Sequence, residues 1–365
     1  MTPHPKIDAI VETYLSLADA EAPGLVEGLY LEGSAALGDY RPDTSDVDFV
    51  AVTAAAPPVG VLERIHTRLG VHPFDGVYLT WDDLGRDPAS LGERPRAHAG
   101  RLNRRGEVNP VTWHTLARHG LTCRGPKPEE LKIWNDPSVL AAWADGNLDR
   151  YWRRLVTRAW RPASLWGLTC LGGYGAVWVV TGVARLHYTL ATGEITSKTG
   201  AGLHALEVFP ERWHRVVNEA LRLRADDTAE ATLSGAVSGL GDHFGTPRRS
   251  LYGSPFERRR DVLAFADQAI GAAHALYGGA GPGSRGSDGG GEHGSSYRRS
   301  WGAGAVKSGR TRVRGVVKHR RARVRGALMD RRAPFMGLCK DRQDLALERS
   351  IAMAEACCCG DGRSA

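Results

Sequence analysis

The chain has 365 residues with 42% hydrophobic and 24% charged side chains, a composition that fits a globular protein of two domains. Its net charge of +7 arises in residues 279–365, which carry 18 Lys and Arg against 8 Asp and Glu, whereas residues 1–278 carry 30 against 33. The body is thus slightly acidic, which disfavours a polyanionic partner such as RNA and accommodates a cationic ligand more easily.

Residues 1–126 alternate patterns typical of helices and strands. Apolar residues at helical spacing predict a helix over 6–20, and a second helix is expected over 59–70. Short apolar strands are predicted over 28–34, 46–52 and 74–80. This alternation predicts a small α/β domain.

From residue 127 the pattern changes to helices rich in Ala, Leu, Arg and Trp. Pro126 and Pro128 mark the boundary, because neither they nor the residues before them favour a continuing helix. Helices are predicted over 136–146, 148–160, 168–191, 199–207, 210–224, 226–240 and 255–277. Four tryptophans among the apolar positions are expected in the core: Trp143, Trp152, Trp160 and Trp178. We therefore expect a first domain over 1–126 and an all-helical second domain over 127–278.

Residues 279–365 contain 16 glycines and little periodicity, which predicts a low-complexity, disordered tail. The Arg-rich centre of the tail is compatible with nucleic-acid binding and equally with an extension that has no function. No function is therefore predicted for the tail.

The cysteines and the N-terminus indicate the compartment. Cys123 and Cys170 are the two cysteines of the body, and neither has a partner at zinc-ligand or disulfide-framework spacing. The first residues form an amphipathic helix pattern rather than a secretory signal. Because no run of about 18 apolar residues occurs, no membrane span is expected either. A reducing, cytoplasmic location is the expectation.

Three carboxylates form the candidate catalytic site. Asp46 and Asp48 lie two residues apart on a predicted strand, so both side chains project from the same face. The two carboxylates repel each other unless a cation lies between them. Mg²⁺ is the natural candidate, because it binds oxygen ligands and keeps substrate phosphates in its coordination shell. Asp75 opens the next strand and is placed to complete the metal ligands or to take a proton from an attacking hydroxyl.

Gly33 and Ser34 end the strand upstream of these carboxylates and enter a helix-like segment. Glycine lets a phosphate approach the backbone, and the amide groups of a helix start together with the serine hydroxyl offer donors. Ser45 adds another candidate phosphate contact. We therefore expect a triphosphate between this turn and the metal.

With these residues in place, the segment GSAALGDYRPDTSDVDFVAV resembles the signature of the polymerase-β nucleotidyltransferase superfamily. Within it, the chain is most similar to the aminoglycoside adenylyltransferases that modify streptomycin and spectinomycin. The resemblance extends over about residues 5–275: FDGVYLTWDDL is similar to the strand of the third carboxylate, and VARLHYTLATGEITSK to a segment that contacts nucleotide phosphates.

The resemblance implies an α+β fold, in which a nucleotidyltransferase domain with a mixed sheet precedes the all-helical domain. It implies ATP as co-substrate, Mg²⁺ held by Asp46, Asp48 and Asp75, and Arg185 and Lys198 on the phosphates. A hydroxyl of a small molecule, with an aminoglycoside as the candidate, would attack the α-phosphorus, with Asp75 as base, and release pyrophosphate.

Two features depart from the family and keep alternatives open. Asp75 stands where these enzymes carry a catalytic Glu, and it is one methylene shorter. The family binds its cationic substrate partly with acids, whereas the stretches AGRLNRRGEVNPVTW and LTCLGGYGAVWVV are basic and apolar respectively. Glu107 is the only acid in the first stretch and a weak candidate for an ammonium group of the substrate. The alternatives are a nucleotidyltransferase of the toxin–antitoxin type, which modifies a protein or an RNA end, and a nucleotide-binding member without transfer activity.

Overall fold

A computed structural model of the chain describes residues 2–42, 44–70, 72–98, 100–225 and 250–279. The expected helix over 226–240 and the tail beyond Gly279 lie outside the described residues. The sheet part contains α1 (Pro5–Glu21), β1 (Gly28–Leu31), α2 (Gly33–Ala36), β2 (Val47–Thr53), α3 (Val59–Leu69), β3 (Phe74–Thr80), α4 (Trp81–Leu84), η1 (Pro88–Ser90), β4 (Arg94–His98), β5 (Arg101–Gly106), α5 (Pro110–His119) and β6 (Leu121–Arg124).

The six strands form one sheet in the order β5-β4-β3-β2-β1-β6. Strands β2 and β3 run parallel, joined by the crossover helix α3, whereas the other neighbouring pairs are antiparallel. The mixed sheet and the helices that follow it confirm the α+β fold class.

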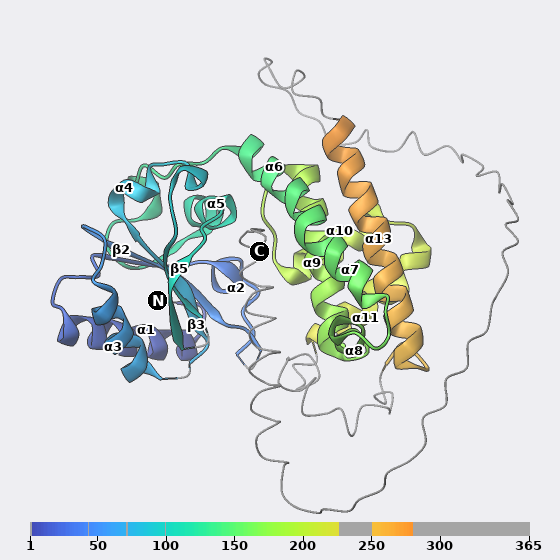
Figure 1. The fold of residues 1–365 in the computed structure, drawn as a ribbon, viewed down its shortest axis with the longest axis horizontal. Coiled ribbons are helices and arrows are strands. Elements are labelled where there is room, and N and C mark those ends of the chain that lie inside the picture. Colours follow the sequence, from blue (N-terminus) through green and yellow to red (C-terminus); the bar gives the residue numbers. More distant parts are fainter. Residues whose placement is uncertain (1, 43, 71, 99, 226–249, 280–365) are drawn as a thin grey trace, which may run out of the picture. The chain divides into compact units, whose positions relative to one another are not determined.

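Both faces of the sheet carry apolar cores, because the strand side chains alternate between them. Leu31, Phe49 and Phe74 pack on one face with residues of α1 and α3. On the other face, Val50 and Val77 pack with residues of α4 and α5. The blue helices α1 and α3 lie together beside the strands in Figure 1. This two-sided burial sets the strand register, since a shift by one residue would exchange the two faces.

In the sheet part, the predicted bounds agree within one residue for helices α1 and α3 and for strands β2 and β3. The first strand is shorter than expected, because it ends at Leu31 and Gly33 already begins α2. Asp46 immediately precedes β2 rather than lying in it. The stretch 94–124, which carried no predicted element, adds β4, β5, α5 and β6 to the sheet part.

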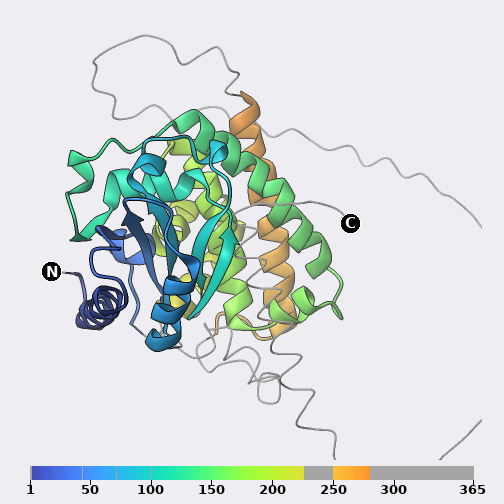
Figure 2. The same ribbon diagram turned by 60° about the vertical axis from the view of Figure 1, so that its left-hand side comes forward.

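The rest of the described chain is helical. It contains η2 (Pro128–Glu130), α6 (Pro137–Asn147), a π-helical segment η3 (Leu148–Arg153), α7 (Arg154–Ala159), α8 (Leu165–Thr169), α9 (Gly173–Thr192), α10 (Lys198–Val208), η4 (Glu211–Trp213), α11 (His214–Ala225) and α13 (Pro255–Gly279). Helix α13, drawn in orange, lies against α9 (Figure 1 and Figure 2). No described helix is both long and apolar enough to cross a membrane. The domain boundary at 126/127 remains a prediction.

Three of the expected helices are interrupted. The helix expected over 168–191 is divided into α8 and α9, with extended backbone at Gly172, where glycine lacks the side chain that favours helix continuation. The one expected over 148–160 starts as the π-helical segment η3, and the one over 210–224 starts as the 3₁₀ turn η4.

The tryptophans follow the expectation in part. Trp152 and Trp178 are buried in the helical core, with ring centroids 5.4 Å apart, and Trp143 packs against that core. Trp160 is exposed, and its indole N–H donates to Asp267 Oδ2 at 2.9 Å. The prediction of a core position was therefore wrong for Trp160.

A fully buried carboxylate, Glu219, holds the helical part together. It accepts hydrogen bonds from Arg222 on its own helix at 2.8 and 3.0 Å, from Ser250 Oγ at 2.7 Å and from the Leu251 N–H at 3.0 Å. Arg258 of α13 adds a contact at 3.3 Å. Burial alone would raise the pKa of Glu219, but these hydrogen bonds lower it to about 2.

Replacing Glu219 by Gln should lower the free energy of unfolding by about 3–5 kcal/mol at neutral pH, because the substitution leaves buried arginines without their carboxylate. The pKa of Glu219 is near 4.5 in the unfolded chain and about 2 in the fold, so its contribution should fade as the pH falls through that interval. Urea unfolding at pH 7 and pH 3 measures both effects. The exposed Glu211→Gln variant is the control, and equal stability of the two variants at pH 7 would contradict the prediction.

Candidate active site

Three carboxylates and a histidine form a row across four neighbouring strands. The Glu32 N–H donates to the Asp48 carbonyl oxygen at 2.9 Å, so these residues lie opposite each other at the β1–β2 edge. Asp48 and Asp75 are register partners on the parallel strands β2 and β3. His98, the last residue of β4, lies next to Asp75, with its Nδ1 2.6 Å from Asp75 Oδ2. The register alone therefore brings together two of the predicted residues, Asp48 and Asp75.

Strand alternation places this row on the face of the sheet that carries α5, just beyond its apolar core. Thr112 of α5 confirms the direction, since its hydroxyl donates to Glu32 Oε1 at 3.4 Å. The row is consequently half-buried rather than a solvated strand edge.

Gly33 approaches the row more closely than any other residue type could. Its φ of +59° lies in the left-handed region, and a Cβ at this position would collide with Asp48 Oδ2. The predicted Gly33-Ser34 turn therefore lies directly against the Asp48 carboxylate.

Burial and mutual repulsion change the protonation of the carboxylates. Burial raises the pKa of Asp48 well above its ordinary value, and the charges of Glu32, Asp46 and Asp75 raise it further, against the opposing charge of Lys198. Burial also raises the pKa of Glu32 to about 7, although Arg96 and Thr112 oppose the shift.

Asp46 belongs to the same electrostatic cluster although part of its side chain is exposed. Desolvation of the carboxyl group raises the pKa of Asp46, and the charge of Asp75 adds to this, whereas Lys198 and His98 oppose it. The site thus holds more negative charge than its cations compensate.

Two further predicted residues lie around this cluster. Lys198 is the first residue of α10 and acts electrostatically on both Asp46 and Asp48, so it approaches the row from the helical part. Ser45 closes the turn before Asp46: its Oγ accepts from the Arg41 N–H at 3.0 Å. The described contacts of Ser45 are thus with the loop itself.

Arg185 is half-buried on α9, and its phosphate role stays a prediction, as do those of Ser34 and Ser45.

The donor set suits a hard cation. Among the described residues, no three His, Cys, Asp or Glu side chains are already arranged to hold a metal ion. Mg²⁺, however, commonly takes one or two carboxylates and fills its remaining positions with substrate phosphates and water. Asp46 and Asp48, destabilised by their neighbours, fit that pattern.

Comparison with known proteins is consistent with this chemistry. Residues 172–238 match the family model described as aminoglycoside adenylyltransferase, C-terminal domain. The match confirms the resemblance to aminoglycoside adenylyltransferases. It supports a nucleotidyltransferase enzyme, and the matched segment includes α9 and α10, the helices that carry Arg185 and Lys198.

Among solved structures, the chain is similar to spectinomycin adenyltransferase AAD(9) from Enterococcus faecialis, crystallised with ATP and spectinomycin. The TM-score is 0.47 at 13% identity, over 73% of this chain and 99% of that chain. No curated protein matches the sequence.

Sequence reasoning missed Glu32 and His98. Glu32 directly precedes Gly33 and Ser34, so the sequence places it beside the predicted turn. Its position opposite Asp48 follows from the pairing of β1 with β2. His98 lies in a basic stretch without an apolar strand pattern, and its role needs the β3–β4 pairing, which no local signal indicates.

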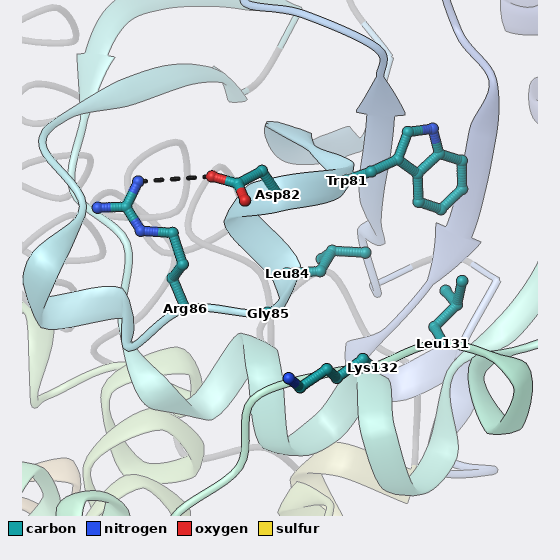
Figure 3. A pocket seen from close by; sticks show the side chains of 7 residues that line it. All are labelled: Trp81, Asp82, Leu84, Gly85, Arg86, Leu131 and Lys132. Atoms are coloured by element: carbon teal, nitrogen blue, oxygen red, sulfur yellow. Dashed lines mark ion pairs between the residues drawn. The ribbon is translucent and has the colours of Figure 1, made fainter.

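The two tryptophans nearest to the site in sequence do not line it. Trp113 is buried in the core beneath α5 and donates its indole N–H to the Leu84 carbonyl at 3.2 Å. Trp81 follows the far end of β3, about 20 Å from Asp75 at ~3.3 Å per residue. It lines a separate pocket of about 330 Å³ with Leu84, Arg86 and others (Figure 3).

Removing the charge of Asp48 should stabilise the protein when no divalent metal is present. Asp48→Asn keeps the shape of the side chain but ends the repulsion, and we expect the free energy of unfolding at pH 8 to rise by about 1–3 kcal/mol. The folded carboxyl keeps its proton to higher pH than the unfolded one, so the wild type should lose stability as the pH rises above about 4, and the variant less so.

Urea unfolding in EDTA at pH 5 and pH 8 measures this difference. The matched control is Asp82→Asn, which removes an exposed carboxylate from the same part of the chain. A lower stability of Asp48→Asn than of wild type at pH 8 would show that the carboxylate is compensated, contrary to the account above.

Proposed function

We propose that the chain transfers AMP from Mg·ATP to a hydroxyl group of a small molecule, with an aminoglycoside antibiotic as the candidate acceptor. One observation carries the proposal: Asp48 and Asp75 are half-buried register partners beside the Gly33 turn. Asp46, which is exposed, and Lys198 belong to the same electrostatic cluster. The family match of the helical part supports the same reaction class.

Asp46 and Asp48 would hold Mg²⁺, and Asp75 would complete the ligands or act as base. When bound, the ion offsets the repulsion in the row and polarises the phosphate oxygens. The pair with His98 holds the Asp75 carboxylate in place, 2.6 Å from His98 Nδ1. Asp75 is shorter than the Glu of the family, so the acceptor hydroxyl must come closer to the sheet.

The nucleotide would lie between the Gly33-Ser34 turn and α10. The Gly33 backbone lies directly against the Asp48 carboxylate, so a phosphate bound at this turn would adjoin the metal site. Lys198 and Arg185 would neutralise charge as it moves onto the leaving pyrophosphate, and Ser34 and Ser45 would add hydroxyl donors.

A cationic acceptor fits the charge of the site. The carboxylates of Glu32, Asp46, Asp48 and Asp75 outweigh the cations around them, and Glu32 extends the row beyond the residues assigned to the metal. An ammonium group of an aminoglycoside beside Glu32 would be stabilised there. An antibiotic-resistance role for the enzyme follows from this proposal.

The test is pyrophosphate release by the full-length chain with Mg·ATP and a panel of aminoglycosides that includes streptomycin and spectinomycin. We expect turnover with at least one of them, and a decrease of about two to three orders of magnitude for Asp46→Asn, because charge stabilisation at the transferring phosphate is lost. The Asp82→Asn variant should retain wild-type turnover.

Two results would contradict the proposal. Equal rates of pyrophosphate release by wild type and Asp46→Asn would show that the Asp46 carboxylate has no role in the reaction. Bound ATP without release for any acceptor in the panel would exclude the resistance activity and favour a nucleotide-binding protein or a different acceptor.

A further inference from the structure

Asp39 is a buried carboxylate that follows the Gly33-Ser34 turn and has no part in the carboxylate row. Its backbone N–H donates to the Ser34 carbonyl oxygen at 2.9 Å, which closes the loop after α2. The side chain is 9% exposed and that of Arg224, at the end of α11, 7%. A buried charge pair of this kind requires complete hydrogen bonding, and each of its contacts is informative.

The Asp39 carboxylate binds two partners from the helical part. Arg224 donates to Oδ2 from Nη2 at 2.8 Å and from Nε at 3.2 Å, and also to the Asp39 carbonyl oxygen at 2.9 Å. Thr199 donates its backbone N–H to Oδ2 at 3.0 Å and its hydroxyl to Oδ1 at 2.8 Å. Arg224 Nε also reaches Thr199 Oγ1 at 3.2 Å, so the three side chains form one closed network.

This network lies at the start of α10, next to Lys198. A cation in the first turn of a helix is unfavourable, because the amide dipoles place partial positive charge there. The Asp39 carboxylate puts a negative charge at the same helix end and accepts the Thr199 N–H, which has no partner within the helix. The negative charge of Asp39 therefore offsets the unfavourable interaction between the Lys198 ammonium group and the helix dipole, and so favours the position of Lys198 opposite Asp46 and Asp48.

We propose that Asp39, held by Arg224, is a positioning residue that fixes the start of α10 and so aims Lys198 at the nucleotide phosphates. The inference rests on the proposed function of the site. It connects the phosphate-binding turn with the phosphate-binding lysine through one carboxylate, so that both move as a unit.

A double-mutant cycle tests the action through Lys198. Asp39→Asn, Lys198→Met and the double variant are compared in the full-length chain for kcat and for the KM of Mg·ATP. A lysine displaced by about 1 Å costs about a hundredfold in kcat. We expect that decrease for Asp39→Asn in the wild-type background and no further decrease in the Lys198→Met background.

The control is Glu219→Gln, which also removes a buried carboxylate that binds an arginine on the same helix as Arg224. Among the described residues, the hydrogen bonds of Glu219 go to α11, to residues 250–251 and to α13, and none goes to Thr199. Any effect of Glu219→Gln on kcat should be the same in both backgrounds. Equal fold-changes for Asp39→Asn in both backgrounds would overturn the proposal. Should Asp39→Asn fail to fold, Thr199→Val, which removes one hydroxyl from the network, takes its place in the cycle.

Amide exchange distinguishes this proposal from the proposed function. If wild type releases no pyrophosphate, the proposed function fails. The positioning of α10 by Asp39 is then tested by the rate of hydrogen exchange of the Thr199 amide. We expect Asp39→Ala to accelerate that exchange at least about tenfold, and the exposed Glu211→Gln variant to leave it unchanged. An unchanged Thr199 rate in Asp39→Ala would overturn the positioning role whatever the activity of the enzyme.

Discussion

The carboxylates of Glu32, Asp48 and Asp75 repel one another, yet the backbone register of the sheet holds them in one row. That register is set by the apolar cores on both faces, where residues such as Phe49 and Val50 point in opposite directions. A slip by one residue would move the acids into the apolar core of the opposite face and disrupt the packing of both faces, which costs far more than the repulsion. The hydrophobic cores therefore hold the carboxylates close together against their repulsion, which a cation bound as proposed would relieve.

The remaining parts of the site follow from that constraint. The backbone at Gly33 lies against the Asp48 carboxylate, where a side chain would collide with it, so the turn that would receive a phosphate adjoins the acid that would hold the metal. The compensating cation, Lys198, comes from a helix of the other part of the chain. Because a lysine is unfavourable at a helix start, a second carboxylate, Asp39, is needed there. In the proposed function, nucleotide binding would thereby be coupled to the packing of the helical part.

Local patterns predicted the parts of the fold with strong periodicity or clear end signals. Strand β3 has the expected bounds because Pro73 precedes its apolar residues and Thr80 caps α4 directly after them, and α3 ends at the residue before Gly70. Strands β4 and β5 were not predicted, since both are rich in Arg and show no apolar pattern. Most residues of β5 are exposed at the edge of the sheet, and most of β4 are half-buried between β3 and β5. His98 was missed with them. The role of Asp39 depends on contacts 160 and 185 residues away, which no local pattern contains.

The most direct test of the account is metal binding to the full-length chain, followed by electron paramagnetic resonance of Mn²⁺ with and without a non-hydrolysable ATP analogue. With few protein ligands arranged in advance, Mn²⁺ should bind weakly alone and at least about tenfold more tightly with the nucleotide, whose phosphates complete the shell. Asp48→Asn should abolish this gain, and Asp82→Asn should not. Equal Mn²⁺ affinity with and without the nucleotide, or an unchanged gain in Asp48→Asn, would contradict the central claim that this row is a metal–nucleotide site.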